Sequence, residues 1–499
     1  MNTTQHSPAS YQLYIDGEWT DPASGEWFDT VEPYSGTVWA RIPRGTAVDA
    51  DRAVQAAHAA YTAGAWPEFT ATQRATLLRK LAALIEDNAD HLGRVEQRDN
   101  GKLITEVRGQ VLNIAQWFYY YAGLADKVGG DVVPVNKPGV FNYTKYEPLG
   151  VVVAITPWNS PLSLTAWKMA PALAAGNTIV IKPSEHASAS ILELARLAGL
   201  AGFPKGVVNV VTGFGAEVGD PLVRHPLTRK IAFTGGDAGG QKVNEAAASS
   251  FKRVTLELGG KSPNVVFDDA DLDQALKGVI SGIFAAAGQT CMAGSRLLVQ
   301  DSIHDEFVAQ LVEVTRQARI GDPSLPDTQV GPIATRDQWE RVMRMIEMAK
   351  ADGATCVLGG HALSGEGYGQ GQFVAPTIFT GVENDMRIAR QEVFGPVLSV
   401  IRFRDEDDAI RLANDTEYGL AAAVWTKDLR RAMKCVDKIQ AGTVWVNNYR
   451  TTSFTSPFGG YKRSGMGREG GVEAIKEYMQ VKSVWITPSP RRDNPFVLG

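Results

Sequence analysis

A single cysteine in a glycine-flanked turn is the first candidate for chemistry in this chain. Cys291 lies in the segment Gly288-Gln289-Thr290-Cys291-Met292-Ala293-Gly294, between a helical run and an apolar strand. The chain has only 3 cysteines in 499 residues, so a disulfide scaffold is not expected. A thiol in such a turn can act as a nucleophile when neighbouring groups favour its thiolate and stabilise the product of its attack.

A carboxylate between leucines is the second candidate. Glu257 lies in Leu256-Glu257-Leu258-Gly259-Gly260-Lys261. Apolar neighbours disfavour the charged carboxylate, so its pKa is expected to be raised, which suits a general base. The alternative interpretation is a strand residue paired with a basic neighbour.

Glycines and polar residues follow each of the expected strands 151–155, 178–181, 207–211 and 230–233. They are Thr156-Pro157-Trp158-Asn159-Ser160, Lys182-Pro183-Ser184-Glu185, Gly213-Phe214-Gly215 with Gly219, and Thr234-Gly235-Gly236. Glycines let a backbone approach a phosphate, and an acid such as Glu185 can bind a ribose diol and repel a 2′-phosphate. The alternative is that these glycines only end strands and cap helices. A literal GxGxxG at 465–470 follows no strand and is interpreted as a loop that opens a helix.

The elements that must position these residues change character near Gly150. Residues 49–130 have the spacing of amphipathic helices, and their aromatic run at 117–121 is interpreted as a packed helix face rather than a binding site. From Gly150, short strands alternate with helices, which is typical of a parallel sheet covered on both faces. A second α/β region follows, with a helix expected over 272–287. Segments 131–147 and 478–486 alternate in polarity and are expected to pair with each other or with another subunit.

Composition excludes several classes of function. The net charge is −5, and no apolar stretch approaches the about 18 residues that a membrane span needs. We therefore expect neither nucleic acid nor a membrane as a partner. The 7 histidines are scattered, so no metal site is expected, and the polar N-terminus and few cysteines predict a cytoplasmic protein.

Seven motifs in order resemble the NAD(P)-dependent aldehyde dehydrogenase superfamily over nearly the whole chain. They are Pro157-Trp158-Asn159-Ser160-Pro161, Lys182-Pro183-Ser184-Glu185, Phe233-Thr234-Gly235, Leu256-Glu257-Leu258-Gly259-Gly260-Lys261, Gly288-Gln289-Thr290-Cys291, Glu392-Val393-Phe394-Gly395-Pro396 and Pro457-Phe458-Gly459-Gly460. The resemblance implies an α/β fold with a Rossmann-like cofactor domain (1–130 and 148–259) and an α/β catalytic domain (260–449). It also implies a small β oligomerisation arm (131–147 and 478–499), with 450–477 returning to the active-site region.

The same resemblance implies a catalytic mechanism. The Cys291 thiolate attacks the aldehyde carbon, and the Asn159 amide and the Cys291 backbone N–H hold the oxyanion. Loss of a hydride to the nicotinamide leaves a thioester, which water activated by Glu257 hydrolyses to the acid. Lys168 and Glu469 match family positions near the proton-transfer route.

The resemblance also implies the cofactor, NAD with NADP as an alternative, and no metal. The implied cofactor-binding residues are Ile155, Thr156, Pro157, Trp158, Lys182, Ser184, Glu185, Gly215, Gly219, Phe233, Gly235, Gly236, Leu258, Gln338, Glu392 and Phe394. Lys182 and Glu185 would bind the adenosine ribose, and Glu392 the nicotinamide ribose. Gly236 departs from the family, because many relatives have a serine there that can reach the pyrophosphate.

The family's aldehyde tunnel maps onto Ser160, Leu164, Trp167, Phe284, Ala285, Met292, residues 450–454 and Phe458. Ser160 and Ala285 are small where relatives often have aromatic residues, so a bulky or aromatic aldehyde is expected. Arg450 is a candidate partner for a substrate carboxylate, which would suit a semialdehyde acid. The alternative is a solvated loop arginine. The resemblance implies a homodimer or homotetramer.

Three rival functions are weighed against a hydrolytic dehydrogenase. A CoA-acylating enzyme would pass the acyl group to CoA, but such enzymes often lack a base at the Glu257 position. A cysteine hydrolase without redox chemistry lacks a recognisable histidine partner for Cys291. A non-catalytic structural relative would need none of Cys291, Glu257 and Asn159.

Overall fold

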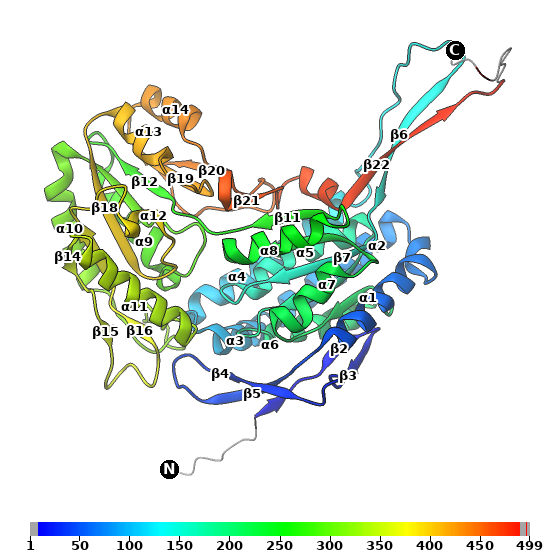
Figure 1. Ribbon diagram of the computed structural model, residues 1–499, viewed down its shortest axis with the longest axis horizontal. Coiled ribbons are helices and arrows are strands. Elements are labelled where there is room, and N and C mark those ends of the chain that lie inside the picture. The colour runs from blue at the N-terminus through cyan, green and yellow to red at the C-terminus, as the bar shows by residue number, and fades with distance from the viewer. Residues whose placement is uncertain (1–7, 490–495, 497–499) are drawn as a thin grey trace.

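The computed structural model describes residues 8–489 and residue 496. The outer ends of two predicted segments, 1–130 and 478–499, therefore lie partly outside the described residues. Two lobes, each built on one large sheet, stand side by side, and a two-stranded arm projects from one of them (Figure 1). None of the described helices is long and apolar enough to cross a membrane.

The first lobe is built on an eight-stranded sheet. Its strands, in spatial order, are β21 (Gly465–Met466), β11 (Arg253–Glu257), β10 (Thr228–Thr234), β7 (Val151–Thr156), β8 (Thr178–Pro183), β9 (Val208–Val210), β2 (Leu13–Ile15) and β3 (Glu18–Thr20). The five strands from β11 to β9 are parallel, whereas β21, β2 and β3 are antiparallel to their neighbours. Parallel pairing brings the carboxyl ends of these five strands to one edge.

Alternating burial explains why helices cover both faces of this sheet. In β7, Val152 and Ala154 join one hydrophobic cluster, and Val151 and Val153 join another on the opposite face. The first cluster contains α2 (Ala71–Asp87), α4 (Ile104–Leu124), α5 (Pro161–Ala175) and α6 (Ala189–Ala201), while α1 (Ala47–Thr62), α7 (Asp220–Arg224) and α8 (Asp237–Ala248) cover the second. Helix α3 (Ala89–Asn100) packs against α4 and α6. The predicted two-sided parallel sheet is confirmed.

The second lobe is built on a seven-stranded sheet. Its strands, in order, are β14 (Thr355–Leu358), β17 (Thr377–Thr380), β18 (Val397–Phe403), β13 (Arg296–Gln300), β12 (Pro263–Val266), β19 (Ala421–Trp425) and β20 (Thr443–Val446). Its helices are α9 (Leu272–Phe284), α10 (His304–Arg316), α11 (Arg336–Ala351), α12 (Arg387–Arg390), α13 (Glu406–Asn414) and α14 (Leu429–Lys438). Apolar residues again alternate between two clusters, with Val265 in one and Val266 in the other.

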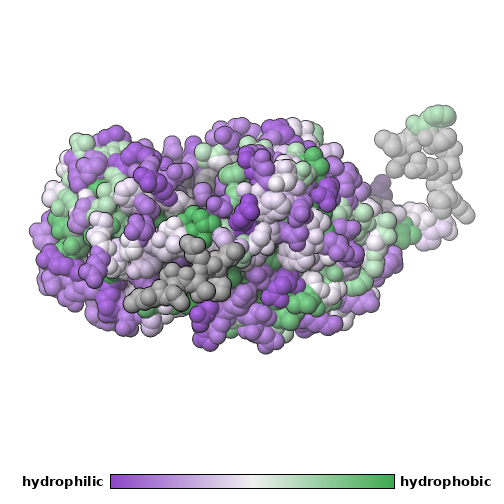
Figure 2. All heavy atoms as spheres, turned by 90° about the horizontal axis from the view of Figure 1, so that it is seen from below, coloured by the Kyte–Doolittle hydropathy of each residue, from purple (hydrophilic) through white to green (hydrophobic). Residues whose placement is uncertain are grey.

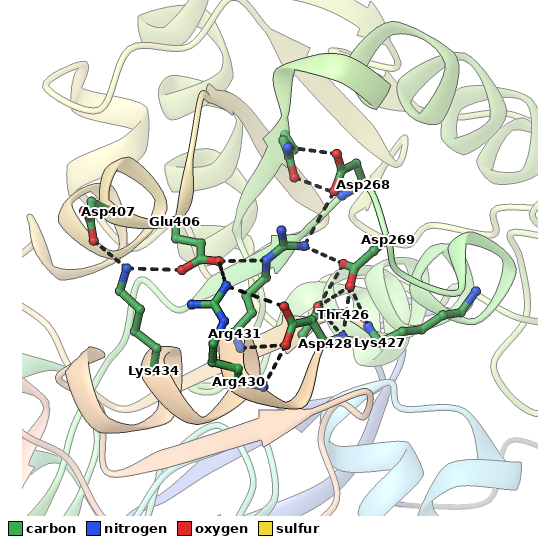
Figure 3. Close-up of polar contacts among 11 residues, drawn as sticks. Asp268, Asp269, Glu406, Asp407, Thr426, Lys427, Asp428, Arg430, Arg431 and Lys434 are labelled. Carbon is green, nitrogen blue, oxygen red and sulfur yellow. Dashed lines mark hydrogen bonds and ion pairs between the residues drawn. The ribbon is translucent and has the colours of Figure 1, made fainter.

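An ion-pair network fastens α13 and α14 to the loop after β12 (Figure 3). The Arg431 guanidinium on α14 donates to Asp269 at 2.7 Å and to Glu406 at 3.2 Å. Asp269 also accepts from the backbone N–H groups of Lys427 and Asp428. The charged groups of this network bond to one another and hold α13 and α14 in place, so we assign the network a structural role.

The projecting arm consists of β6 (Phe141–Pro148) and β22 (Met479–Ile486), which pair antiparallel along their whole length. The prediction that these two segments pair is confirmed. Smaller sheets join β1 (Ala9–Ser10), β5 (Val38–Pro43) and β4 (Trp27–Val31), and β15 (Ala362–Leu363) with β16 (Phe373–Val374). The face seen in Figure 2 is mainly hydrophilic, with small apolar patches and some apolar surface at the base of the arm.

Two local expectations are corrected. The helix expected over 272–287 ends at Phe284, and Ala286 and Ala287 then adopt the left-handed region with φ of 53° and 51°. The GxGxxG segment does not simply open a helix, because Gly465 belongs to β21 and pairs with Glu257. Gly465, Gly467 and Gly470 all have positive φ, which explains these glycines without a phosphate.

Candidate active site

The three predicted catalytic residues come from three different connections and meet between the lobes. Asn159 lies between β7 and α5, Glu257 is the last residue of β11, and Cys291 precedes β13. The Asn159 side-chain amide donates to the Gln289 carbonyl oxygen at 3.0 Å, two residues before the nucleophile. The charge of Glu257 contributes to raising the pKa of Cys291, so the two side chains lie near each other.

The surroundings of Cys291 favour its protonated thiol. Burial, with the nearby carboxylates of Glu392 and Glu257, raises the pKa of its thiol to about 12. Hydrogen bonds from the backbone N–H groups of Met292 and Cys291 act in the opposite direction and would favour a negative sulfur. The loop therefore offers donors to an anion, but the surrounding charge must change before the thiolate forms.

Glu257 matches the expectation of a base in apolar surroundings. Its side chain is 4 % exposed, and neither carboxylate oxygen has a hydrogen-bond partner among the described residues. Burial and then the charge of Glu469 raise its pKa well above the usual value, while Lys168 and Arg468 oppose the shift. A carboxylate kept dry and unpaired in this way is available to a water or a substrate.

A buried ion pair lies behind Glu257. The Lys168 ammonium, from α5, donates to Glu469 Oε1 at 2.5 Å and to Thr234 Oγ1 at 2.6 Å. The second oxygen of Glu469 has no partner among the described residues. Because Glu469 and Lys168 both act on the pKa of Glu257, these three groups form one electrostatic unit.

The strand ends carry the residues predicted to bind a dinucleotide. Thr156 at the end of β7 is paired in register with Pro183 of β8, and Ile155 with Phe233 of β10. The Lys182 ammonium donates to the Pro183 carbonyl at 2.9 Å and to Glu185 Oε2 at 3.3 Å. Burial raises the pKa of Glu185, but Lys182, a backbone hydrogen bond and His186 together outweigh that effect, so the net shift is downward and favours the carboxylate.

The glycines at this edge leave room for a ligand. A Cβ added at Gly215 or Gly236 would meet no atom within 4 Å, and one at Gly219 would lie 3.7 Å from the Lys182 side chain. Gly235 differs, because an added Cβ would clash with the Phe233 ring at 2.7 Å. Open glycines beside a buried lysine and a carboxylate fit a ribose and phosphates, so the predicted residues suit the group implied for them.

The segment at 392–394 is braced from α11. The Gln338 amide donates to the carbonyls of Val393 and Phe394, both at 2.9 Å, and Arg341 donates to the carbonyl of Glu392 at 2.8 Å. The Phe394 ring stands edge-on to Trp158 at 5.4 Å. The Gln338 side chain therefore binds backbone carbonyls of this segment instead of pointing freely at a ligand.

Glu392 itself lies against the turn that follows Glu257. Its Oε1 accepts the Gly260 N–H at 3.0 Å, and burial raises its pKa to about 7. The remaining predicted cofactor residues occupy the turns around it. Leu258 is buried and donates its N–H to Ser464, Ser184 lies in the turn after β8, and Pro157 precedes Trp158.

Four aromatic residues, Trp117, Trp167, Trp445 and Phe458, line part of a cavity of about 290 Å³. Trp167 on α5 stacks on Trp117 of α4 at 4.7 Å, and Phe458 stands edge-on to Trp167 at 5.4 Å. The run at 117–121 was interpreted as core, and Trp117, Phe118 and Tyr121 are indeed buried. Trp117 nevertheless also lines this cavity, a role that helical spacing alone does not reveal.

Arg450 and two residues that sequence reasoning missed complete the surroundings. The Arg450 guanidinium donates to the Ser281 carbonyl at 3.0 Å. Lys102 donates to Ser160 Oγ at 2.5 Å, and Glu106 accepts the N–H of Ala286 at 3.2 Å. Lys102 lies between two expected helices, 91–100 and 106–125, and Glu106 begins the second of them, so nothing in their sequence distinguishes them from surface residues.

Comparisons with known proteins identify the family of the chain. A sequence model described as the aldehyde dehydrogenase family matches residues 19–484. The (Z)-2-((N-methylformamido)methylene)-5-hydroxybutyrolactone dehydrogenase of Acinetobacter baylyi is 46% identical over 98% of this chain and 99% of its own length. An aldehyde dehydrogenase of Emericella nidulans is 45% identical over 95% and 94%.

A solved structure shows the same fold. Betaine aldehyde dehydrogenase from Staphylococcus aureus, in complex with NAD+, superposes with a TM-score of 0.96 at 40% identity over 98% of this chain and 97% of that one. The described residues contain no cluster of His, Cys, Asp and Glu side chains suited to a metal ion. A family match along nearly the whole chain, together with relatives above 40% identity, shows that the chain is an enzyme of the aldehyde dehydrogenase family.

Proposed function

We propose that this enzyme oxidises an aldehyde to the free carboxylic acid, with NAD as hydride acceptor and Cys291 as acyl carrier. The observation that supports it most is the buried Glu257 carboxyl group, which acts electrostatically on the thiol and has both oxygens unpartnered among the described residues. A base beside the nucleophile suits a reaction in which water must attack an enzyme-bound thioester.

The first step is attack of the Cys291 sulfur on the aldehyde carbon. The thiol proton must leave, because the pKa of about 12 keeps the sulfur protonated near neutral pH, and Glu257 is the carboxylate placed to accept it. The carbonyl oxygen becomes an oxyanion as the C–S bond forms. Asn159 uses one amide N–H for Gln289, so its second N–H is available to that oxyanion, with the Cys291 backbone N–H as the other donor.

The thiohemiacetal then loses a hydride and becomes a thioester. Bound NAD supplies the acceptor for that hydride. Lys182, Glu185 and the open glycines Gly215 and Gly236 would hold its adenosine end, and Glu392 and Phe394 its nicotinamide end. The carboxylate of Glu185 would repel a 2′-phosphate, so NAD is proposed over NADP.

Hydrolysis completes the cycle. Once Glu257 has released the proton that it took from Cys291, it takes a proton from water, whose oxygen attacks the thioester carbon and expels the Cys291 sulfur. The Lys168–Glu469 pair behind Glu257 is buried and gives the proton a polar route away from the base.

Glu257 also argues against the CoA-acylating alternative, which needs no water activation. The test is product analysis: free acid formed without CoA supports the proposal, and a strict need for CoA contradicts it.

The substrate class is proposed from the tunnel residues. The small Ser160 and Ala285 and the aromatic cavity beside Trp167 favour a bulky or aromatic aldehyde. Arg450 would add affinity for a carboxylate, as in a semialdehyde acid, although one of its N–H groups is engaged by Ser281. In an aldehyde panel, Arg450→Ala should lower kcat/KM more for acidic than for neutral aldehydes. An equal loss for both would remove the carboxylate role.

A further inference from the structure

A buried lysine is directed at the residue next to the predicted oxyanion donor. Lys102 is 7 % exposed, and its ammonium donates to Ser160 Oγ at 2.5 Å and to Gln110 Oε1 at 2.9 Å. Burial lowers the pKa of Lys102 and Arg450 adds to that shift, while Glu96 and Glu106 favour its charged form. Two carboxylates beside one lysine keep the ammonium compensated in this dry setting.

Ser160 occupies a helix-capping position but does not cap. It is the N-cap residue of α5, where a serine hydroxyl usually accepts a backbone N–H of the first turn, yet no such bond is formed. The N–H of Leu162 is instead taken by Glu96 Oε2 at 3.1 Å. Glu96 therefore caps the N-terminus of α5 in place of Ser160, and the Ser160 hydroxyl oxygen bonds to Lys102 instead.

This arrangement fixes the direction of the Ser160 hydrogen bond. An ammonium can only donate, so Ser160 Oγ must accept from Lys102, and its own hydroxyl proton must point elsewhere. The described residues offer no acceptor for that proton, and Ser160 is half-buried whereas Lys102 is buried. A serine hydroxyl whose oxygen already accepts a hydrogen bond from an ammonium is a stronger hydrogen-bond donor than a serine hydroxyl without such a partner.

Several contacts link this donor to the Cys291 loop. Asn159, the preceding residue, reaches the Cys291 loop through Gln289. Arg450 acts electrostatically on Lys102, and the adjacent Tyr449 donates to the Met292 carbonyl at 2.9 Å and is influenced by Cys291. Lys102, Ser160, Arg450 and the nucleophile therefore share one region.

We propose that Lys102 and Ser160 form a specificity-determining donor that selects aldehydes with a second acceptor oxygen besides the carbonyl oxygen. Such an oxygen belongs to a hydroxyl or to a carboxylate, and a plain alkyl aldehyde lacks it. The inference rests on the proposed aldehyde oxidation and narrows its substrate class. A site with a committed donor disfavours an analogue that leaves the donor unpaired.

The test compares matched aldehydes in the wild type and in Ser160→Ala. The pairs are 2-hydroxypropanal with propanal, and 4-oxobutanoate with pentanal, each followed by NADH formation. The wild type should prefer the oxygenated member, and the ratio of kcat/KM within a pair should fall about ten- to a hundredfold in Ser160→Ala. Ser160→Thr keeps the hydroxyl and should retain most of the preference.

The two pairs identify the source of the oxygen. A fall confined to the first pair assigns a hydroxyl, and a fall confined to the second assigns a carboxylate; either supports the proposal. Lys102→Met should lower the same ratio because Ser160 loses its ammonium, and the exposed Lys277→Met, which removes a positive charge from α9, should not. Circular dichroism checks whether Lys102→Met is folded. If that variant does not fold, the result for Ser160→Ala alone tests the proposal.

Two results overturn the inference without touching the proposed reaction. One is a wild type that oxidises both members of each pair without preference. The other is a Ser160→Ala variant that loses the same fraction of kcat/KM for both members, which would make the pair only a support for the start of α5. If no aldehyde yields NADH with the wild type, the proposed function itself is wrong.

Discussion

The raised pKa values of Glu257 and Cys291 have consequences for the pH dependence of the reaction. Burial and Glu469 raise the pKa of Glu257 well above the usual carboxyl value. Below that pKa the group is protonated and cannot take a proton from water, so hydrolysis should slow as the pH falls. Steady-state kcat should rise with pH through the raised pKa, and Glu257→Gln should lose that limb. A pH-independent kcat in the wild type would speak against Glu257 as the base.

The Cys291 thiol makes a second prediction at the residue scale. Its pKa of about 12 means that the thiolate fraction grows about tenfold per pH unit from neutral pH to about pH 10. Alkylation of the cofactor-free enzyme by iodoacetamide should rise in the same proportion, as measured by mass spectrometry. Cys291→Ala corrects for labelling of Cys356 and Cys435. A rate that levels off near neutral pH would show a thiolate already formed in the resting enzyme.

Several residue roles could be predicted from the sequence because motif and chemistry coincide. Glu257 between leucines is buried with a raised pKa, and the Asn159 amide reaches the Cys291 loop. Lys102 could not be found in this way. Its burial depends on Glu96, Gln110 and Ser160, which approach it only after α3, α4 and α5 have packed.

At the scale of elements, the Cys291 loop depends on a glycine that no side chain can replace. Gly288 has φ of 71°, and a Cβ there would lie 2.1 Å from the Gly395 carbonyl oxygen. Gly288→Ala should therefore lower the free energy of unfolding by more than about 2 kcal/mol and displace the nucleophile. Thermal unfolding and NADH formation together measure both effects.

Gly109 provides the matched control. It lies exposed within α4, and a Cβ there would meet nothing within 4 Å. Gly109→Ala should raise stability by about 0.5–1 kcal/mol, because alanine loses less conformational entropy in a helix. If Gly288→Ala were as stable and active as Gly109→Ala, the close approach of the Cys291 loop to Gly395 would not matter.

The expected helix over 272–287 shows why element ends are hard to predict. Ala285, Ala286 and Ala287 have high helix propensity, yet the helix ends at Phe284 and two of the alanines are left-handed. Glu106, distant in sequence, accepts the N–H of Ala286 and replaces a helical bond. The strand–helix alternation after Gly150 was predictable because each buried strand carries its own apolar run.

At the scale of the whole molecule, residues 8–489 provide no cover for the exposed apolar side chains of the arm. Strands β6 and β22 pair with each other, and Val481 and Trp485 of β22 are each 58 % exposed. An isolated two-stranded hairpin is marginally stable in water, so we propose that a second copy of the chain covers it. The pairing of the two arm strands could be predicted from the sequence. The number of subunits, two or four, stays a prediction.

Disruption of the arm should reduce assembly. Trp485→Asp places a charge on the exposed apolar strand and should shift the mass in analytical ultracentrifugation toward the monomer. Leu200→Asp is the control, because Leu200 is 64 % exposed on α6, outside the arm. A monomeric wild type, or a Trp485→Asp variant with the wild-type mass, would contradict an oligomerisation role.

The central claim is that Cys291 carries the acyl group and Glu257 releases it. The most direct measurement mixes Glu257→Gln with NAD and an aldehyde, and then determines the intact mass and the modified peptide. The account predicts one NADH per active site in a burst, and a mass increase equal to the acyl group on the peptide that contains Cys291. Sustained turnover by Glu257→Gln, NADH formation by Cys291→Ala, or an acyl group on another residue would contradict it.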